Sequence, residues 1–340
     1  MNILADASLS GLTQAFPAPF KLSFYHCNKD VPSLLKGQDV LLCRATLKVN
    51  ECLLKDHSLQ YVATASSGSD HLDHDYLALR GIIALDAKGC NAFAVADYVL
   101  SSIAHLRVNY SWKGRRIGII GMGHVGTQVA LRLPYLGFEV VCFDPLKALQ
   151  NAAFASCSEE MLYDCDLLCL HAQLHDTPPY ASRNMIDTHF LNQLNPDCII
   201  LNAARGELVD EQALLESPVR YCTDVYQHEP QINKEIIAKA MLCTPHIAGH
   251  SIEAKWNAVM FISQQLHTLL RWPHPHYIMP ENACPIMLQC VDWEKIALTS
   301  YNPINETLRL KQATDISQEF IALRQQHNKR HNLLWALNES

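Results

Sequence analysis

The sequence lacks several features that would place it at a membrane or on nucleic acid. It has no run of roughly 18 uninterrupted apolar residues, the length that a membrane-spanning helix needs. No stretch is dense in Lys and Arg, and the formal net charge is −7. The first residues read as a strand, without the basic and apolar segments of an export signal. We therefore expect a cytoplasmic protein that binds neither nucleic acid nor membrane and holds anionic ligands with a few placed cations.

Metal and disulfide signatures are also missing. The 13 cysteines are scattered, none forms a CxxC pair, and Cys142, Cys169 and Cys198 lie within apolar runs, so we expect buried, reduced thiols. The 17 histidines include no HExxH frame and no third ligand at familiar zinc spacing. Surface histidines explain them better than a metal site does, and we expect no metal.

Short apolar strands alternate with helical stretches along most of the chain, which predicts an α/β fold with parallel sheets. In the first part of the chain the expected strands are 3–5, 22–25, 40–44, 61–64 and 81–85. The alternation restarts at Arg116 and predicts a doubly wound sheet with strands 116–120, 139–143, 166–170, 198–202, 220–224 and 241–244. A long helical pattern at 91–106 is expected to cross between the two domains, and a second at 252–272 is expected to return to the first domain and make it discontinuous. The region from Glu294 is expected to be irregular and then helical.

The most informative motif is the glycine pattern that follows the strand 116–120. Gly121 permits a tight turn, Gly123 lets backbone N–H groups approach a pyrophosphate at a helix N-terminus, and Gly126 allows close packing of helix and strand. The next strand ends in Asp144, at the spacing expected for the acid that binds the ribose hydroxyls. Its carboxylate would repel a 2′-phosphate, so the motif predicts NAD rather than NADP. Pro134 should kink or shorten the helix that follows the glycines.

Three polar residues lie where the later strands end, at the edge at which open α/β sheets bind ligands. Arg205 could hold a 2-hydroxy carboxylate with its planar fork. His246 could accept the hydroxyl proton, and Glu229 could orient its ring and raise its basicity. Each residue also has an ordinary structural explanation as a surface turn, an element boundary or a structural hydrogen-bonding group. Their order behind a dinucleotide motif is what favours catalysis.

The segments around these residues, 202–210, 224–230 and 244–249, resemble the catalytic signatures of the D-isomer specific 2-hydroxyacid dehydrogenases. Within that family the chain resembles the members that oxidise 4-phospho-D-erythronate to (R)-3-hydroxy-2-oxo-4-phosphooxybutanoate in pyridoxal 5′-phosphate biosynthesis. The narrower resemblance rests on segments 44–50, 64–73, 89–92, 248–255 and 319–324. It covers residues 1–270 well and the remainder loosely.

The resemblance implies an architecture and a set of site residues. The implied domains are a flavodoxin-like substrate domain at 1–93 completed by 251–275, a Rossmann NAD domain at 94–250, and a C-terminal region at 276–340 that forms a homodimer. The implied catalytic residues are Arg205, Glu229 and His246. The implied NAD contacts are Gly121, Gly123, His124, Val125, Gly126, Asp144, Ala172, Asp224 and Gly249, and the implied substrate contacts include Ala45, Ser66 and His250. Ala45, Ala172 and His250 stand where the family usually has serine, threonine and tyrosine.

A phosphorylated substrate needs cations that a plain hydroxy acid does not. Arg44 and Lys48 flank the end of a strand in the first domain and are candidates, although a solvated strand end explains them equally well. Two other functions remain open at this point. One is an NAD-dependent dehydrogenase of another 2-hydroxy acid, such as 3-phosphoglycerate or an unphosphorylated acid. The other is a non-catalytic protein that senses NAD on the same fold.

Overall fold

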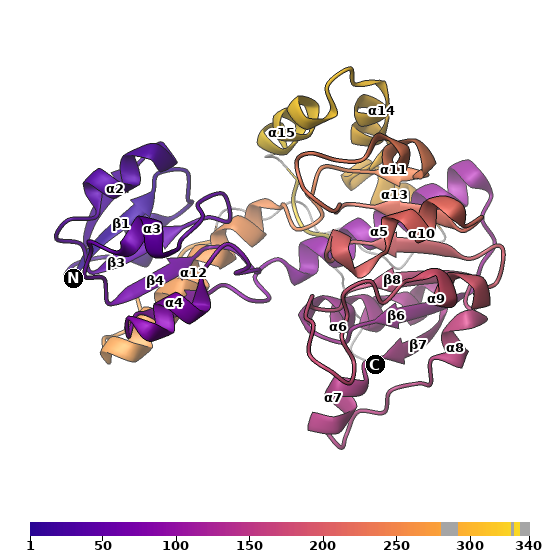
Figure 1. Cartoon of the computed structure of the whole chain (residues 1–340), viewed down its shortest axis with the longest axis horizontal. Helices are drawn as coiled ribbons and strands as arrows, with labels where there is room; N and C mark the ends of the chain where they lie inside the picture. Colours follow the sequence, from indigo (N-terminus) through magenta and orange to yellow (C-terminus); the bar gives the residue numbers. More distant parts are fainter. Residues whose placement is uncertain (280–291, 328–329, 334–340) are drawn as a thin grey trace. The chain divides into compact units, whose positions relative to one another are not determined.

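The computed structural model describes residues 1–279, 292–327 and 330–333. The chain divides into two compact units, and each is described by itself (Figure 1). The first unit comprises Met1–Asn91 and Ser251–Asn282, and the second comprises Ala92–His250 and Ala283–Ser340.

The first unit is built on a parallel sheet of five strands in the order β2-β1-β3-β4-β5. This is the flavodoxin-like order. All five strands were predicted from their apolar runs, and the parallel pairing is confirmed. Their bounds are β1 Asn2–Asp6, β2 Lys21–Tyr25, β3 Val40–Cys43, β4 Tyr61–Thr64 and β5 Ile83–Asp86.

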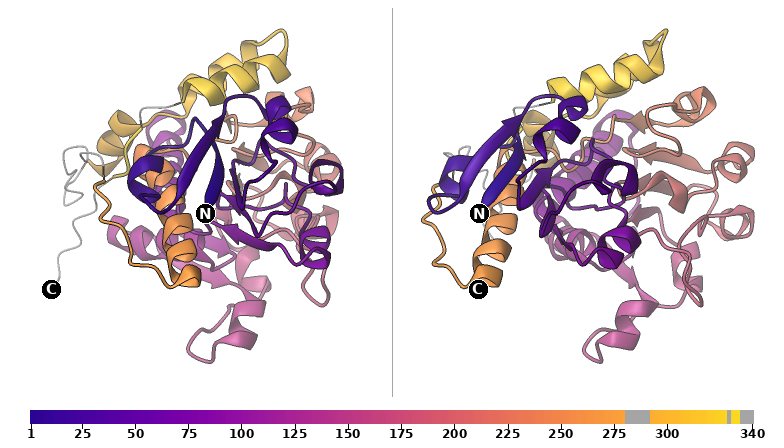
Figure 2. Two further views of the ribbon diagram at one scale, coloured as in Figure 1. Left: turned by 90° about the vertical axis from the view of Figure 1, so that its left-hand side faces the viewer. Right: turned by 60° about the vertical axis from the view of Figure 1, so that its left-hand side comes forward.

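Helices cover both faces of this sheet. On one face α1 (Leu12–Ala15) and α12 (Ile252–Leu270) contribute side chains such as Val259 and Ile262 to a common core with β1 and β3. Figure 2 shows α12, in orange, running alongside the strands of its own unit. The opposite face carries a 3-10 turn, η1 (Asn28–Asp30), and the helices α2 (Val31–Leu34), α3 (Glu51–Leu54) and α4 (His74–Leu79). Because β3 and β4 are covered on both sides, each of their residues is buried.

The second unit has a six-stranded parallel sheet in the order β11-β10-β9-β8-β6-β7. The strand order reverses between β6 and β8, and ligands of doubly wound sheets bind at the carboxyl ends of strands beside such a reversal. All six predicted strands are confirmed: β6 Arg116–Ile120, β7 Glu139–Phe143, β8 Leu167–Leu170, β9 Ile199–Asn202, β10 Arg220–Thr223 and β11 Leu242–Cys243.

One face of this sheet is covered by α5 (Ala92–Tyr110), α6 (His124–Arg132) and α13 (Trp293–Ser300). The expectation of an irregular segment at Glu294 is therefore wrong. Trp293 and Ala297 are buried in the core that α5 shares with β6. This tertiary packing stabilises a helix that the local sequence pattern did not predict.

The opposite face is covered by α8, α9, α10, α11, α14 and α15. Their bounds are Glu160–Tyr163, Thr188–Gln193, Glu211–Glu216, Lys234–Lys239, Ile304–Gln312 and Ile316–Gln326. Side chains of Asp187, Asp210 and Asn233 cap three of them by accepting first-turn N–H groups. The remaining short elements are α7 (Pro145–Gln150), η2 (Leu133–Leu136) and η3 (Gly206–Leu208).

Two local predictions can be compared with this unit. The α-helical part of α6 stops at Arg132 and continues as the 3-10 turn η2, so the expected effect of Pro134 is confirmed. Cys169 and Cys198 are buried as predicted, whereas Cys142 lies on the edge strand β7 and is only partly buried. Across the described residues, no helix is both long enough and apolar enough to cross a membrane.

Candidate active site

The glycine turn after β6 is shaped by contacts that exclude side chains. Gly121 has φ +93° and donates its N–H to the carbonyl of Phe143 at 2.8 Å. A Cβ at Gly121 would overlap the backbone of Ala172 after β8, and a Cβ at Gly126 would overlap the carbonyl of Gly121. The predicted reasons for glycine at these two positions are therefore present in the structure: a left-handed turn at Gly121 and close packing of α6 on the turn at Gly126.

Gly123 differs from both, because a Cβ there would meet no atom within 4 Å. It precedes the first turn of α6, which begins at His124 and Val125, and no side chain caps that helix. The first backbone N–H groups of α6 are thus available to a ligand, and the helix dipole favours a negative one. The open space at Gly123 is suited to the close approach of a pyrophosphate.

This contrast makes a prediction about Gly123→Ala. We expect the unfolding midpoint to stay near that of the unchanged protein, and the Kd for NAD to rise by roughly tenfold or more because a methyl group occupies the space of the phosphates. Thermal unfolding and titration of NAD measure the two quantities. Gly126→Ala is the matched control and should lower the unfolding midpoint. A Gly123→Ala protein that binds NAD normally would contradict this assignment.

Asp144 is held beside the glycine turn. One of its carboxylate oxygens accepts the N–H of Met122 at 2.7 Å, and the other accepts the N–H of Lys147 at 2.9 Å and so caps α7. Lys147 Nζ in turn donates to the carbonyl of Met122 at 2.6 Å. A carboxylate can accept further hydrogen bonds at each oxygen. Asp144 is thus fixed where a ribose bound on this turn could donate its hydroxyls.

The three candidate catalytic residues follow adjacent strands. Arg205, Glu229 and His246 lie beyond the carboxyl ends of β9, β10 and β11, which neighbour one another in the sheet. The turn at Arg205 is stabilised by Asn202, whose side chain donates to the Arg205 carbonyl at 2.8 Å and accepts from the N–H of Ala204 at 3.1 Å. The fold thus brings the three loops to one edge of the sheet, the edge that also carries the glycine turn.

His246 and Glu229 form a hydrogen-bonded pair. His246 Nδ1 lies 2.7 Å from Glu229 Oε2, and the other carboxylate oxygen accepts the N–H of Tyr226 at 3.0 Å. Burial raises the pKa of Glu229, but the neighbouring His246 and these hydrogen bonds outweigh it, so the pKa lies below its ordinary value. An ionised carboxylate only accepts, so the hydrogen sits on Nδ1. The lone pair of Nε2 is then available to accept a proton.

The loop that carries His246 is anchored by the side chain of Asp224. This buried carboxylate accepts hydrogen bonds from Thr244 Oγ1 at 2.6 Å and from the N–H groups of Ile247 and Ala248, both at 2.8 Å. Burial raises the pKa of Asp224, and these donors and the nearby His246 offset only part of the effect. His246 itself has φ +55°, a strained conformation for histidine that surrounding bonds must maintain.

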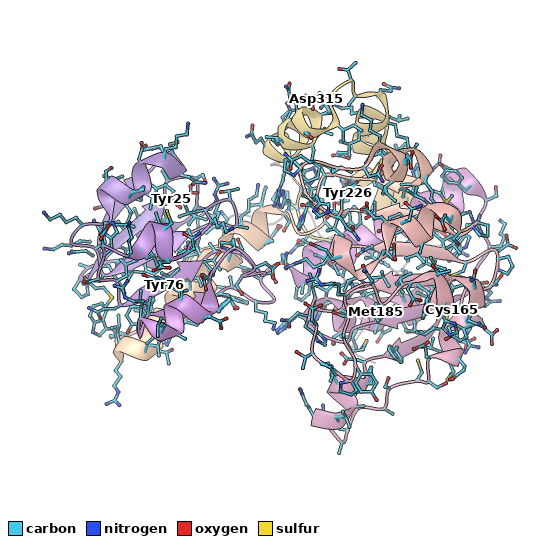
Figure 3. All side chains as sticks on the ribbon, viewed as in Figure 1. Tyr25, Tyr76, Cys165, Met185, Tyr226 and Asp315 are labelled. Atoms are coloured by element: carbon cyan, nitrogen blue, oxygen red, sulfur yellow. The ribbon has the colours of Figure 1, made fainter. Side chains whose placement is uncertain are left out.

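Two tyrosines complete this anchor. The hydroxyl of Tyr98 on α5 lies 2.8 Å from Thr244 Oγ1, and the hydroxyl of Tyr226 donates to the carbonyl of Thr244 at 2.9 Å. Tyr226, labelled in Figure 3, also packs edge-on against Phe320 of α15. Sequence reasoning placed Asp224 beside NAD and missed its role in the loop, because the donors come from residues whose proximity only the folded sheet reveals. Contact of Asp224 or Gly249 with NAD remains a prediction.

The substrate candidates of the first unit lie at the ends of the adjacent strands β3 and β4. The Ser66 hydroxyl accepts the N–H of Ala45 at 3.2 Å. Arg44 is half exposed and pairs with the buried Asp6 at 2.8 Å. Burial raises the pKa of Asp6, but hydrogen bonds from Ser8 and Arg44 lower it further, so Asp6 is ionised. Lys48 is exposed, and His250 belongs to the second unit.

Sequence reasoning missed one cation in this group. Lys255, on α12, is partly buried, and its pKa is lowered first by burial and then by the charge of Arg44. Its proximity to Arg44 follows from the return of α12 to the first sheet. In the sequence Lys255 belongs to the segment 248–255, but no spacing rule relates it to residue 44.

In the described ranges of the chain, no group of three or more His, Cys, Asp or Glu side chains is arranged to hold a metal ion. His171 lies at the end of β8, where its N–H bonds to the carbonyl of Ile120 at 2.7 Å and burial lowers the pKa of its ring to about 3. The groups suited to a cofactor are instead those of the glycine turn.

Comparison with known proteins agrees with this geometry. Residues 99–248 match the family model described as D-isomer specific 2-hydroxyacid dehydrogenase, NAD binding domain. The erythronate-4-phosphate dehydrogenase of Legionella pneumophila subsp. pneumophila is 51% identical over 335 residues, which cover 98% of this chain and 95% of that protein. The counterpart from Bacteroides thetaiotaomicron is 30% identical and covers 92% of each chain.

A solved structure extends the comparison to the fold. The NAD⁺-bound 3-phosphoglycerate dehydrogenase of Entamoeba histolytica superposes with a TM-score of 0.68 at 22% identity, covering 80% of this chain and 95% of that one. At this identity the likeness speaks for the fold alone. The sequence relatives identify the group more narrowly, and the chain belongs to the erythronate-4-phosphate dehydrogenases, within the D-isomer specific 2-hydroxyacid dehydrogenase family.

Proposed function

We propose that this protein oxidises 4-phospho-D-erythronate to (R)-3-hydroxy-2-oxo-4-phosphooxybutanoate with NAD, in the biosynthesis of pyridoxal 5′-phosphate. The observation that carries the proposal is the 2.7 Å contact between His246 Nδ1 and Glu229 Oε2, on the sheet edge that also bears the glycine turn. A protein that only senses NAD has no need of an oriented imidazole there. The named relatives support the choice of substrate.

The chemistry divides among three side chains. The glycine turn and Asp144 would hold NAD, which would supply the acceptor for the hydride on C2 of the substrate. His246 Nε2 takes the hydroxyl proton, and Glu229 stabilises the imidazolium that forms. Arg205 holds the substrate carboxylate and the oxygen on C2, which gains carbonyl character as the hydride leaves. The proton and the hydride together account for the two hydrogens that the substrate loses.

The phosphate of the substrate calls for positive charge away from the reacting carbon. In the first unit this charge would come from Arg44, Lys48 and Lys255. The Ser66 hydroxyl accepts the N–H of Ala45, the residue that follows Arg44. The pKa of Lys255 is lowered first by burial and then by repulsion from the charge of Arg44, so the two cations lie near each other. A phosphate bound there would relieve this repulsion.

We also propose the domain roles that the resemblance implies. Residues 1–93 and 251–275 would hold the substrate, residues 94–250 would hold NAD, and the region 276–340 would mediate a homodimer in the cytoplasm. Sedimentation of the purified protein tests the dimer, since a monomer at micromolar concentration would contradict it.

A substrate panel tests the function directly. NADH absorbance is followed with 4-phospho-D-erythronate, D-erythronate and 3-phosphoglycerate at equal concentrations. We expect kcat/KM for 4-phospho-D-erythronate to exceed the other two by roughly 10²-fold or more, because a substrate without the phosphate, or with a different backbone, loses the contacts of the phosphate with these cations. Similar activity with D-erythronate would contradict the phosphate site. Preference for 3-phosphoglycerate would replace the proposed substrate, and NAD binding without any NADH formation would favour a sensor.

Lys48→Ala tests the phosphate contact. We expect the KM for 4-phospho-D-erythronate to rise by roughly 10- to 100-fold with little change in the Kd for NAD, because a charge-assisted hydrogen bond is lost. Lys36→Ala, which removes another exposed lysine of the same unit, is the matched control and should leave KM unchanged. An unchanged KM in Lys48→Ala would remove Lys48 from the substrate site.

A further inference from the structure

We propose that Arg330, near the C-terminal end, is a positioning residue that clamps the segment 247–250 behind His246. Its guanidinium is buried, with 8% of the residue exposed. Nε donates to the carbonyl of His250 at 3.0 Å, and Nη2 donates to the carbonyls of Ala248 at 2.5 Å and Ala94 at 3.3 Å. The inference rests on the proposed function for the role of segment 247–250 in binding NAD and substrate, whereas the contacts of Arg330 are independent of that function.

The segment is held from two sides. Asp224 accepts the N–H groups of Ile247 and Ala248, while Arg330 donates to the carbonyls of Ala248 and His250. The N–H and the carbonyl of Ala248 are therefore each bonded to a buried charged side chain. Between these anchored residues lies Gly249, a predicted NAD contact, and at the end lies His250, a predicted substrate contact. Arg330 thus determines the path of the backbone that presents both.

The geometry requires a guanidinium. Its planar array of donors reaches carbonyls on two different segments, α5 at Ala94 and the loop at 248–250, whereas an ammonium group has a single donor atom. The plane also lies over the ring of Tyr301, with Cζ 4.8 Å from the ring centroid. Ala94 and Ala248 are buried, so removal of the side chain leaves buried carbonyls without these donors.

His327 and Leu333, which are described on either side of Arg330, also make contacts within the second unit. His327 Nδ1 lies 3.3 Å from Glu306 Oε1, and the His327 ring packs edge-on against Tyr301. Beyond Arg330, the N–H of Leu333 donates to the buried carboxylate of Asp97 on α5 at 2.8 Å. Described residues on both sides of Arg330 therefore have hydrogen bonds of their own.

The proposal separates two kinds of defect. His246 keeps its own anchors through Glu229 and Asp224 when Arg330 is removed, whereas the carbonyls of Ala248 and His250 lose theirs. Loss of Arg330 should therefore weaken binding more than it slows proton transfer. We expect Arg330→Ala to raise the Kd for NAD and the KM for 4-phospho-D-erythronate by roughly tenfold to 100-fold, to lower kcat less, and to leave the shape of the pH profile of kcat unchanged.

The decisive experiment compares Arg330→Ala and Arg330→Lys in the full-length protein. NAD affinity is titrated without substrate, and amide hydrogen exchange is followed in peptides covering 244–252. We expect faster exchange there in both variants and partial recovery of NAD affinity in Arg330→Ala, but not in Arg330→Lys, on addition of methylguanidinium. Arg309→Lys, an exposed arginine of α14 paired with Glu319, is the matched control and should behave as the unchanged protein.

The outcomes are distinguishable from failure of the proposed function. NAD affinity and amide exchange need no substrate, so they test the clamp even if 4-phospho-D-erythronate is not turned over. Unchanged exchange at 247–250 with unchanged NAD affinity overturns the proposal. So does a fall in kcat with both binding constants preserved. If Arg330→Ala fails to fold, Arg330→Lys keeps the charge and the long side chain, and its exchange and NAD affinity decide the question.

Discussion

Replacing His246 with Asn should lower kcat by about 10³- to 10⁴-fold while leaving the Kd for NAD nearly unchanged. The imidazole is the group that takes the hydroxyl proton, and its Nδ1 is fixed by Glu229 at 2.7 Å. Asn is the replacement of choice because it tolerates the left-handed backbone at this position, where φ is +55°. Steady-state NADH formation and a fluorescence titration of NAD measure the two effects.

Glu229→Gln supplies the companion measurement. The amide keeps the shape of the side chain but removes the charge that stabilises the imidazolium, so the loss in kcat should be smaller than in His246→Asn. The Kd for NAD should change little, because the hydrogen bonds of Glu229 run to His246 and to the N–H of Tyr226. Equal losses of turnover and of NAD affinity in His246→Asn would mean that the residue supports the loop rather than the reaction.

Replacing Arg205 with Lys should lower kcat/KM for 4-phospho-D-erythronate by about 10²- to 10³-fold, with little effect on NAD affinity. Both side chains are cationic, but the ammonium group cannot grip a carboxylate and the neighbouring oxygen with two parallel hydrogen bonds. The backbone turn at this position is held by Asn202 and should survive the change. The comparison of kcat/KM with NAD titration therefore reports on the substrate side alone.

Arg183→Lys is the matched control for this substitution. Arg183 lies in the same unit on the surface, where it pairs with Asp176 at 2.8 Å, and exposed ion pairs of this kind contribute little. Its kinetic constants should not change. An Arg205→Lys protein with full kcat/KM would show that the guanidinium does not hold the substrate, and the proposed division of roles would fail at that residue.

Much of the framework could be predicted from local sequence. The buried parallel strands are continuous apolar runs, so their positions were predictable without knowledge of their neighbours. The glycine turn is equally local, because the positive φ of Gly121 and the close approach at Gly126 restrict those positions to glycine whatever surrounds them. Helix α13 is the counterexample. It forms because Trp293 and Ala297 are buried against α5, a contact between distant parts of the chain.

The amino-acid sequence by itself therefore determined where the strands lie along the chain, where the nucleotide-binding turn forms and which residues are available for chemistry. Only the tertiary structure decided which of them meet: Glu229 with His246, Asp224 with the loop that follows Thr244, Lys255 with Arg44, and Arg330 with Ala248. The reason is physical. Local backbone conformation depends mainly on neighbours in the sequence. Hydrogen bonds and charge interactions between distant residues depend on distances in space, which are established only when helices and sheets pack together.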